Sequence, residues 1–177
     1  MSADNRAALG AACLSLAAAA LIAIACRGGD GEPSLEEYFR GIDGIGDQAT
    51  LRFGERAVEP PAADASEEEL AEYARATLRE SAAILREARD SFDELKPPSE
   101  VRKPHNQFVD ALTTTTEAVD EIADGLPDAL SAEELAALET ELDTPEITEA
   151  GDQLDEACRV LQAIATSNEI EVDLQCQ

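Results

Sequence analysis

The stretch SEEELAEYARATLRESAAILREARDSFDEL, residues 66–95, decides the fold. Apolar or small side chains recur in it every three or four residues, which is the spacing of one face of an α-helix. These positions are Leu70, Ala74, Leu78, Ser81, Leu85, Ala88, Phe92 and Leu95, with Ile84 beside them. Ser66 followed by Glu69 forms a capping box, a typical start of a helix. The stretch therefore predicts one long amphipathic helix.

Three further stretches have the same spacing, and the chain punctuates them with Pro60-Pro61, Pro97-Pro98 and Gly125-Leu126-Pro127. Their predicted inward positions are Leu35, Phe39, Ile42, Gly46, Ala49 and Phe53; Val101, His105, Phe108, Leu112, Thr115, Val119, Ile122 and Leu126; and Ile147, Gly151, Leu154, Cys158, Leu161 and Ala165, with Ile164 alongside. Four such stripes favour helices packed at small crossing angles.

Helix starts are marked by polar caps. Ser34 with Glu37 and Ser131 with Glu134 are further capping boxes, and Thr144-Pro145 combines an N-cap with proline at the first helical position. The box at Ser131 predicts a short connector helix near residues 131–141. We expect an all-α fold: an antiparallel four-helix bundle with a short connector helix and an extended C-terminal tail.

The first predicted helix contains Gly41, Gly44 and Gly46. Each glycine costs about 1 kcal/mol relative to alanine inside a helix. We interpret them as places of close helix approach or a kink. The alternative is an opening in the backbone where a ligand lies.

The N-terminal segment is predicted to be an export signal. Residues 7–25 are uncharged and mainly Ala and Leu, they follow Arg6, and Cys26 comes directly after them. This pattern fits a secretory signal and also the length of a transmembrane helix. The sequence Ala23-Ile24-Ala25-Cys26 resembles the lipobox of bacterial lipoprotein signal peptides. That resemblance implies cleavage before Cys26 and a diacylglycerol on its sulfur.

The resulting domain plan has three parts. Residues 1–25 are the signal peptide, residues 26–33 are the lipidated cysteine with a glycine-rich tether, and residues 34–177 are the helical bundle domain. We expect the protein at the cell membrane, lipid-anchored on the extracytoplasmic face. An uncleaved anchor helix and simple secretion are the alternatives.

Cys158 and Cys176 are predicted to form a disulfide, which an exported domain permits. The helix climbs roughly 14 Å from Cys158 to about Ser167. The tail then alternates polar and apolar residues and returns by a similar distance, at about 3.3 Å per residue. Ile170, Val172, Leu174 and Cys176 would face the bundle. Metal-binding or redox thiols are the alternative, but there is no C-x-x-C spacing and only one histidine.

Lys96-Pro97-Pro98 precedes a helix containing His105, and the chain ends in a tail that runs from one cysteine to another. This combination loosely resembles small uncharacterised helical-bundle lipoproteins of bacteria. The resemblance implies a fold and no activity.

His105 lies on the predicted inward stripe near the start of its helix, and we expect a half-buried side chain that closes the bundle end. A catalytic role would need a positioned partner. A di-iron site would need Glu-x-x-His pairs, and the residue three before His105 is Arg102. In the run Thr113–Thr116 we expect one threonine to face the core and the others solvent, with a polar patch inside the bundle as the alternative.

The net charge of −26 restricts the partners. It argues against nucleic acid and against electrostatic docking on anionic lipid, because both need clustered basic side chains. It would attract a basic partner or divalent cations. Asp43 and Asp47 do not form an EF-hand loop, because Ile45 would occupy its third position. We predict no cofactor and no metal site.

The sequence favours a non-catalytic binding or scaffolding module at the cell envelope. Its expected partners are the membrane, through the lipid anchor, and an envelope protein or cationic ligand. A weak divalent-cation or cationic-ligand binding protein is one alternative. A hydrolase using His105 is another.

Overall fold

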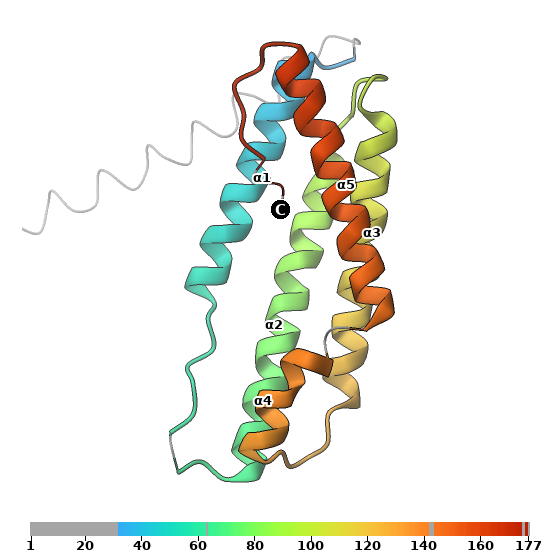
Figure 1. Ribbon diagram of the computed structural model, residues 1–177. Coiled ribbons are helices and arrows are strands. Elements are labelled where there is room, and N and C mark those ends of the chain that lie inside the picture. Colours follow the sequence, from blue (N-terminus) through green and yellow to red (C-terminus); the bar gives the residue numbers. More distant parts are fainter. Residues whose placement is uncertain (1–31, 63, 142–143, 175, 177) are drawn as a thin grey trace, which may run out of the picture. The chain divides into compact units, whose positions relative to one another are not determined.

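The structure is a computed structural model that describes residues 32–62, 64–141, 144–174 and 176 (Figure 1). Its contacts separate Met1–Glu32 from Pro33–Gln177, and the description concerns the second unit. The proposed lipobox ending at Cys26 and the apolar residues 7–25 lie outside the described residues. Within the described ranges, no helix combines the length and the apolar character that crossing a membrane requires.

The described chain is all-helical, as predicted, and contains no strand. Its helices are α1 (Leu35–Glu55), α2 (Glu67–Glu94), α3 (Arg102–Gly125), α4 (Ala132–Glu141) and α5 (Pro145–Ser167). α4 is the predicted connector helix. The helices pack as a bundle, and residues 168–174 follow α5 without forming regular structure.

The predicted caps explain where four of the helices begin. Ser34 and Ser66 form complete capping boxes at the starts of α1 and α2. At α4, the Ser131 amide donates to the Glu134 carboxylate at 2.8 Å, and the Ser131 hydroxyl accepts from the Glu134 amide at 3.2 Å. Thr144 caps α5, with proline at its first position. α3 instead begins after Val101, which has no polar side-chain atom.

α2 and α3 lie at the centre of the packing, and α3 contacts both α2 and α5 (Figure 1). α2 also contacts α1 and α4. α1 and α5 have at most a marginal direct contact. Tail residues 168–172 instead lie beside the first half of α1, where they line a polar depression with it. The tail therefore separates α1 from α5.

The core consists of two clusters. The first contains Tyr38, Phe39, Ile42, Phe92, Val101, Leu112, Leu161 and Ala165. The second contains Ala71, Ala74, Leu78, Ala82, Val119, Ala123, Leu130 and Leu138. Buried residues of α1 belong only to the first cluster. The core is thus shared by α1, α2, α3 and α5 at one end and by α2, α3 and α4 at the other.

The predicted inward stripe of α1 is wrong at its C-terminal end. Phe53 is 43% exposed and Leu51 is 63% exposed. This half of α1 is joined to α2 by ion pairs, in which Arg52 contacts Glu87 and the Arg56 guanidinium lies 3.0 Å from the same carboxylate. A helix with a single neighbour buries a narrower stripe than one surrounded by others, so Phe53 remains at the surface.

Candidate functional site

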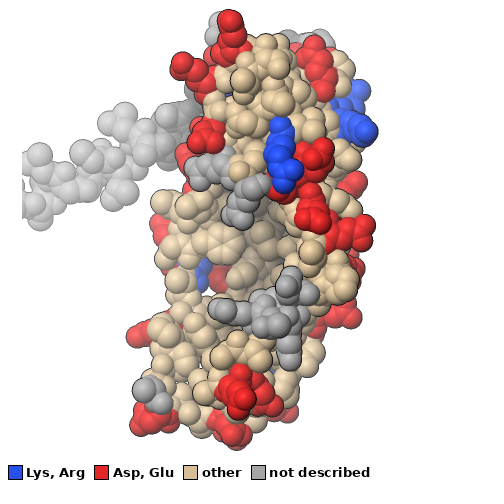
Figure 2. Space-filling model, viewed as in Figure 1, with Lys and Arg blue, Asp and Glu red and all other residues tan. Residues whose placement is uncertain are grey.

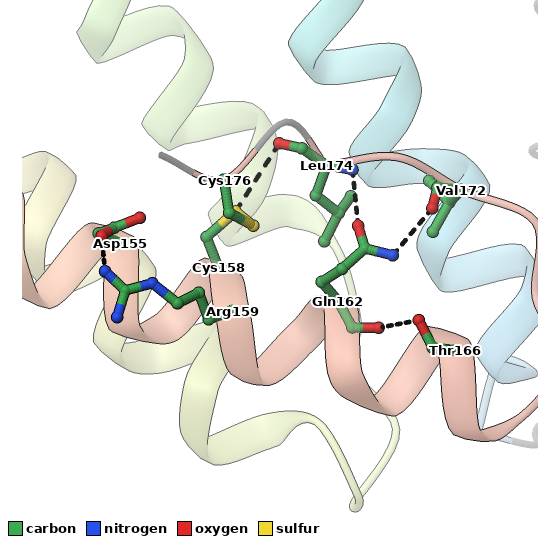
Figure 3. The surroundings of a disulfide bond; sticks show 8 residues. All are labelled: Asp155, Cys158, Arg159, Gln162, Thr166, Val172, Leu174 and Cys176. Atoms are coloured by element: carbon green, nitrogen blue, oxygen red, sulfur yellow. Dashed lines mark hydrogen bonds and ion pairs between the residues drawn. A yellow bond between two sulfur atoms is a disulfide. The ribbon is translucent and has the colours of Figure 1, made fainter.

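The C-terminal tail is clamped to α5. Cys158 and Cys176 form the predicted disulfide, with an S–S distance of 2.00 Å and Cα atoms 5.6 Å apart (Figure 3). Between these cysteines, the Gln162 amide nitrogen donates to the Val172 carbonyl at 2.9 Å, and the Leu174 amide donates to the Gln162 side-chain oxygen at 2.8 Å. One glutamine side chain therefore pairs with the tail as the backbone of a neighbouring strand would.

The tail reverses direction through a defined helix end. Glu169 has a left-handed φ of 57°. The Ile170 amide donates to the Ala165 carbonyl at 3.0 Å and the Glu169 amide to the Thr166 carbonyl at 3.2 Å, which together form a Schellman motif. Ile170, Val172 and Leu174 then pack against the first core cluster, as predicted. The intervening residues Glu169, Glu171 and Asp173 are exposed.

A cavity of about 300 Å³ lies between α1, α2, α3, α5 and the C-terminal tail. Its deepest lining residues are Phe92, Leu112 and Leu161, which are 6%, 7% and 1% exposed. The rings of Phe92 and Phe108 lie there with their centroids 4.7 Å apart. The floor of the cavity is thus apolar and partly aromatic.

The cavity wall includes all parts of the domain except α4. α1 contributes Ile42, Ile45 and Ala49; α2 contributes Leu85 and Ala88; α5 contributes Cys158; and the tail contributes Leu174. Three exposed carboxylates also line the cavity, from Asp43 and Asp47 of α1 and Asp173 of the tail. Exposed acids above a buried apolar floor define a mouth that opens to solvent.

The α1 glycines serve different purposes. A Cβ atom at Gly41 would lie 3.0 Å from Leu95 Cδ2, so close approach explains this glycine. At Gly44 and Gly46 a Cβ atom would meet no described atom within 4 Å. Gly46 lines the cavity and follows Ile42 by four residues on the same helix face. The close-approach interpretation is therefore wrong for Gly44 and Gly46, and the missing side chain at Gly46 leaves part of the cavity open.

His105 is more buried than predicted, with only 3% of its surface exposed. Its Nδ1 lies 3.1 Å from the Tyr38 hydroxyl, which joins the first turns of α1 and α3. Burial lowers the pKa of His105, while the charge of Asp93 raises it. Burial also raises the pKa of Tyr38 well above its ordinary value. His105 is not among the described residues that line the cavity.

The prediction that one threonine of the run 113–116 faces the core and the others face solvent is confirmed in part. Thr116 is 2% exposed and faces the core, whereas Thr113, Thr114 and Thr115 are only partly buried. Each of the four hydroxyls donates to the carbonyl four residues earlier, such as Thr116 to Leu112 at 2.7 Å. These bonds occupy the donor hydrogens within α3, so the run offers no hydroxyl donor to a ligand.

Two residues of this region carry no signal in the sequence. Gln162 is a single polar residue within the apolar run of residues 160–165, and its backbone partners come near only after the tail folds back. Tyr38 sits one position before Phe39, outside the strict stripe, yet it is 2% exposed. The contact of Tyr38 with His105 can be predicted only when the packing of α1 on α3 is known.

No cluster of three His, Cys, Asp or Glu side chains placed to hold a metal ion occurs in the described part of the chain. Comparison of the chain with protein-family models, curated proteins and solved structures found no match. The kind of ligand that this site could bind therefore has to be inferred from the residues that line the cavity. An apolar floor with acids at the mouth suits binding of an apolar group from solvent.

Proposed function

We propose that this chain is an exported, membrane-anchored lipoprotein whose helical domain is a non-catalytic binding module at the cell envelope. The observation that supports binding is the open apolar cavity of about 300 Å³. Ligand pockets in proteins have volumes of about 300–1,000 Å³ and mostly apolar linings. The volume and the mostly apolar lining of this cavity are compatible with that class of site and support a small-molecule ligand.

Contacts on two sides of the cavity hold its walls in place, which indicates that the cavity is a permanent feature of the fold. The disulfide and the Gln162 hydrogen bonds hold the tail on one side. On the other side, the ion pairs of Arg52 and Arg56 hold α1 beside α2 rather than across the opening. Each exposed ion pair contributes only about 0.2–1 kcal/mol, so these contacts orient α1 more than they stabilise it.

The anchor part of the proposal is supported by Ala23-Ile24-Ala25-Cys26 and by the glycine-rich residues that follow. The disulfide between Cys158 and Cys176 is typical of an oxidising compartment outside the cytoplasm. Two or more acyl chains would anchor the chain stably, whereas one would not. Secretion without a lipid is the alternative for localisation.

We also propose that α1, α2, α3 and α5 form an antiparallel four-helix bundle. The contacts of α1 with α2, α2 with α3 and α3 with α5 are compatible with this order. The tail would then occupy the fourth seam, between α1 and α5. Such bundles commonly place ligand sites between facing helices.

The test is the mass of the intact protein from the membrane fraction of its own host, measured under denaturing and native conditions. Under denaturing conditions we expect a species that begins at Cys26 and carries acyl groups. Under native conditions we expect an additional bound small molecule, which the Gly46→Leu variant should lose and the Gly44→Leu variant should keep. An unprocessed or unlipidated chain would contradict the anchor. A mass unaffected by Gly46→Leu would contradict the cavity as the binding site.

A further inference from the structure

We infer that the cavity binds a small organic cation, with an amine or ammonium group at the acidic mouth and an apolar body of about ten carbon atoms against Phe92 and Phe108. This inference rests on the proposed function of the cavity as a binding site. It adds the chemical class of the ligand, which neither the fold nor the comparisons supply.

The size of the body follows from the volume. An apolar cavity of roughly 150 Å³ accepts one benzene molecule. A cavity of about 300 Å³ therefore holds about ten to twelve carbon atoms. The Phe92 and Phe108 rings offer faces and edges to an aromatic or alkyl group. A complete phospholipid would be far too large to enter.

The charge of the ligand follows from the mouth. Asp43 and Asp47 lie one helical turn apart on α1, and both line the cavity. Among the described residues that line the cavity, none is Lys or Arg. The nearby Arg40 pairs with Glu36 at 2.9 Å, on the turn that precedes the mouth. A carboxylate or phosphate entering the cavity would face like charges, whereas an ammonium group would face opposite ones.

The wider surface acts in the same direction. Acidic side chains are spread over the face shown in Figure 2, and basic side chains occupy only a few places on it. A net charge of −26 raises the local concentration of organic cations and lowers that of anions. The net charge of the chain and the carboxylates at the cavity mouth therefore both favour a positively charged ligand.

A bare divalent cation does not fit the same space. Metal ions such as calcium take six to eight oxygen ligands, and among the described residues no three His, Cys, Asp or Glu side chains are placed to hold a metal ion together. The floor of Phe92, Leu112 and Leu161 has no side-chain oxygen to offer. The apolar floor favours a cation that carries its own apolar body.

The experiment uses three probes with the same phenylbutyl body: 4-phenylbutylamine, 4-phenylbutan-1-ol and 5-phenylpentanoate. They differ only in a positive, neutral or negative head group at neutral pH. Affinity is measured by calorimetry on the full chain in nanodiscs of a zwitterionic lipid, with empty nanodiscs subtracted. We expect the amine to bind tightest, the alcohol more weakly and the carboxylate weakest.

Two pairs of variants locate the effect. Gly46→Leu places a side chain into the cavity and should abolish binding of all three probes. Gly44→Leu is its matched control, because Gly44 also has open space around it but does not line the cavity. Asp43→Asn with Asp47→Asn should weaken the amine by about fivefold or more and leave the alcohol unchanged, whereas the exposed, remote Asp152→Asn should change neither.

The outcomes separate this inference from the proposed function. If all three probes bind equally and Gly46→Leu abolishes binding, the cavity is a binding site and the inferred charge of its ligand is wrong. If none binds, or if Gly46→Leu binds as well as the unaltered chain, both proposals are wrong. Amine binding that persists in Gly46→Leu and weakens only with salt would indicate surface attraction and would overturn the inference.

Discussion

At the scale of single residues, the hydrogen bond between Tyr38 and His105 links stability to pH. Burial lowers the pKa of His105 below its ordinary value of 6.5. Between that lowered value and 6.5, the unfolded chain binds more protons than the folded one. The stabilising contribution is therefore complete above pH 6.5 and is lost as the pH falls through the folded-state pKa. We therefore expect lowering the pH from 7 to 5 to reduce the urea midpoint of the wild-type protein relative to that of a variant without this histidine.

The control for this prediction is His105→Gln, which keeps a polar group near Tyr38 but does not titrate in this range. The variant should be less stable at pH 7, and its midpoint should depend less on pH between 7 and 5. An equal pH dependence in both proteins would assign the effect to carboxylates and contradict the role of His105.

Glu169 is the second residue for which the structure makes a specific prediction. Its positive φ places a side chain where glycine is preferred, at a cost of about 1–2 kcal/mol. Glu169→Gly relieves this strain but increases the freedom of the unfolded chain. We expect a net gain of about 0.5–1 kcal/mol in the free energy of unfolding, measured by urea denaturation.

The neighbouring exposed residue provides the control for this change. Glu171→Gly removes the same charge from the tail without the same backbone requirement, and it should destabilise the protein or have no effect. Equal stabilisation by both variants would show that the lost negative charge, rather than the backbone at Glu169, is responsible.

Single residues also show what the sequence predicts poorly. Phe53 fits the helical period but is exposed, because its half of α1 has only α2 beside it. His105 was expected half-buried and is 3% exposed, because Tyr38 covers it from another helix. The period identified the inward face correctly for His105 and wrongly for Phe53. The degree of burial depended on a neighbour that is distant in sequence.

At the scale of elements, the amide of Gln162 holds the tail to α5 by two hydrogen bonds. A hydrogen bond of this kind contributes about 0.5–1.5 kcal/mol. We therefore expect Gln162→Ala to lower the free energy of unfolding by about 1–2 kcal/mol and to speed amide hydrogen exchange at Leu174. Gln153→Ala, at an exposed position of the same helix, should do neither.

The disulfide supports the same tail through a different mechanism. Removing it by Cys176→Ser reopens a loop whose ends lie 18 residues apart, which should cost about 3 kcal/mol of stability. Because Leu174 and Asp173 line the cavity, affinity for 4-phenylbutylamine should fall as well. Wild-type protein treated with dithiothreitol should match the variant, and unchanged stability in both would contradict the prediction.

Helix starts were the most predictable elements. The boxes at Ser34, Ser66 and Ser131 and the cap at Thr144 act within a single turn, so sequence spacing alone defines them. The Cys158–Cys176 pair was predictable for a related reason, since helix rise and tail length must match. The cavity was not predictable in the same way, because it depends on how four helices and the tail pack together.

At the scale of the whole molecule, the acidic charge and the inferred cation site at the cavity would act together. The charge attracts cations over distances set by the ionic strength, and the mouth provides the local site. The proposed lipid on Cys26 would keep this field at a membrane surface, where cationic molecules and anionic headgroups are both present. The domain itself would be repelled from those headgroups and would stand off at the end of its tether.

The same charge predicts how stability depends on salt. The chain has 39 acidic and 13 basic residues, so repulsion exceeds attraction when it folds into a small volume. The screening length falls from about 30 Å at 0.01 M salt to about 3 Å at 1 M. We expect Tm to rise by roughly 5 °C between these NaCl concentrations, which corresponds to about 1–2 kcal/mol for a domain of this size. Most of the rise should occur below about 0.2 M, because that is where screening changes most.

A flat or falling Tm would show that the exposed ion pairs outweigh repulsion. A larger shift with CaCl2 than with MgCl2 at equal ionic strength would indicate a specific calcium site.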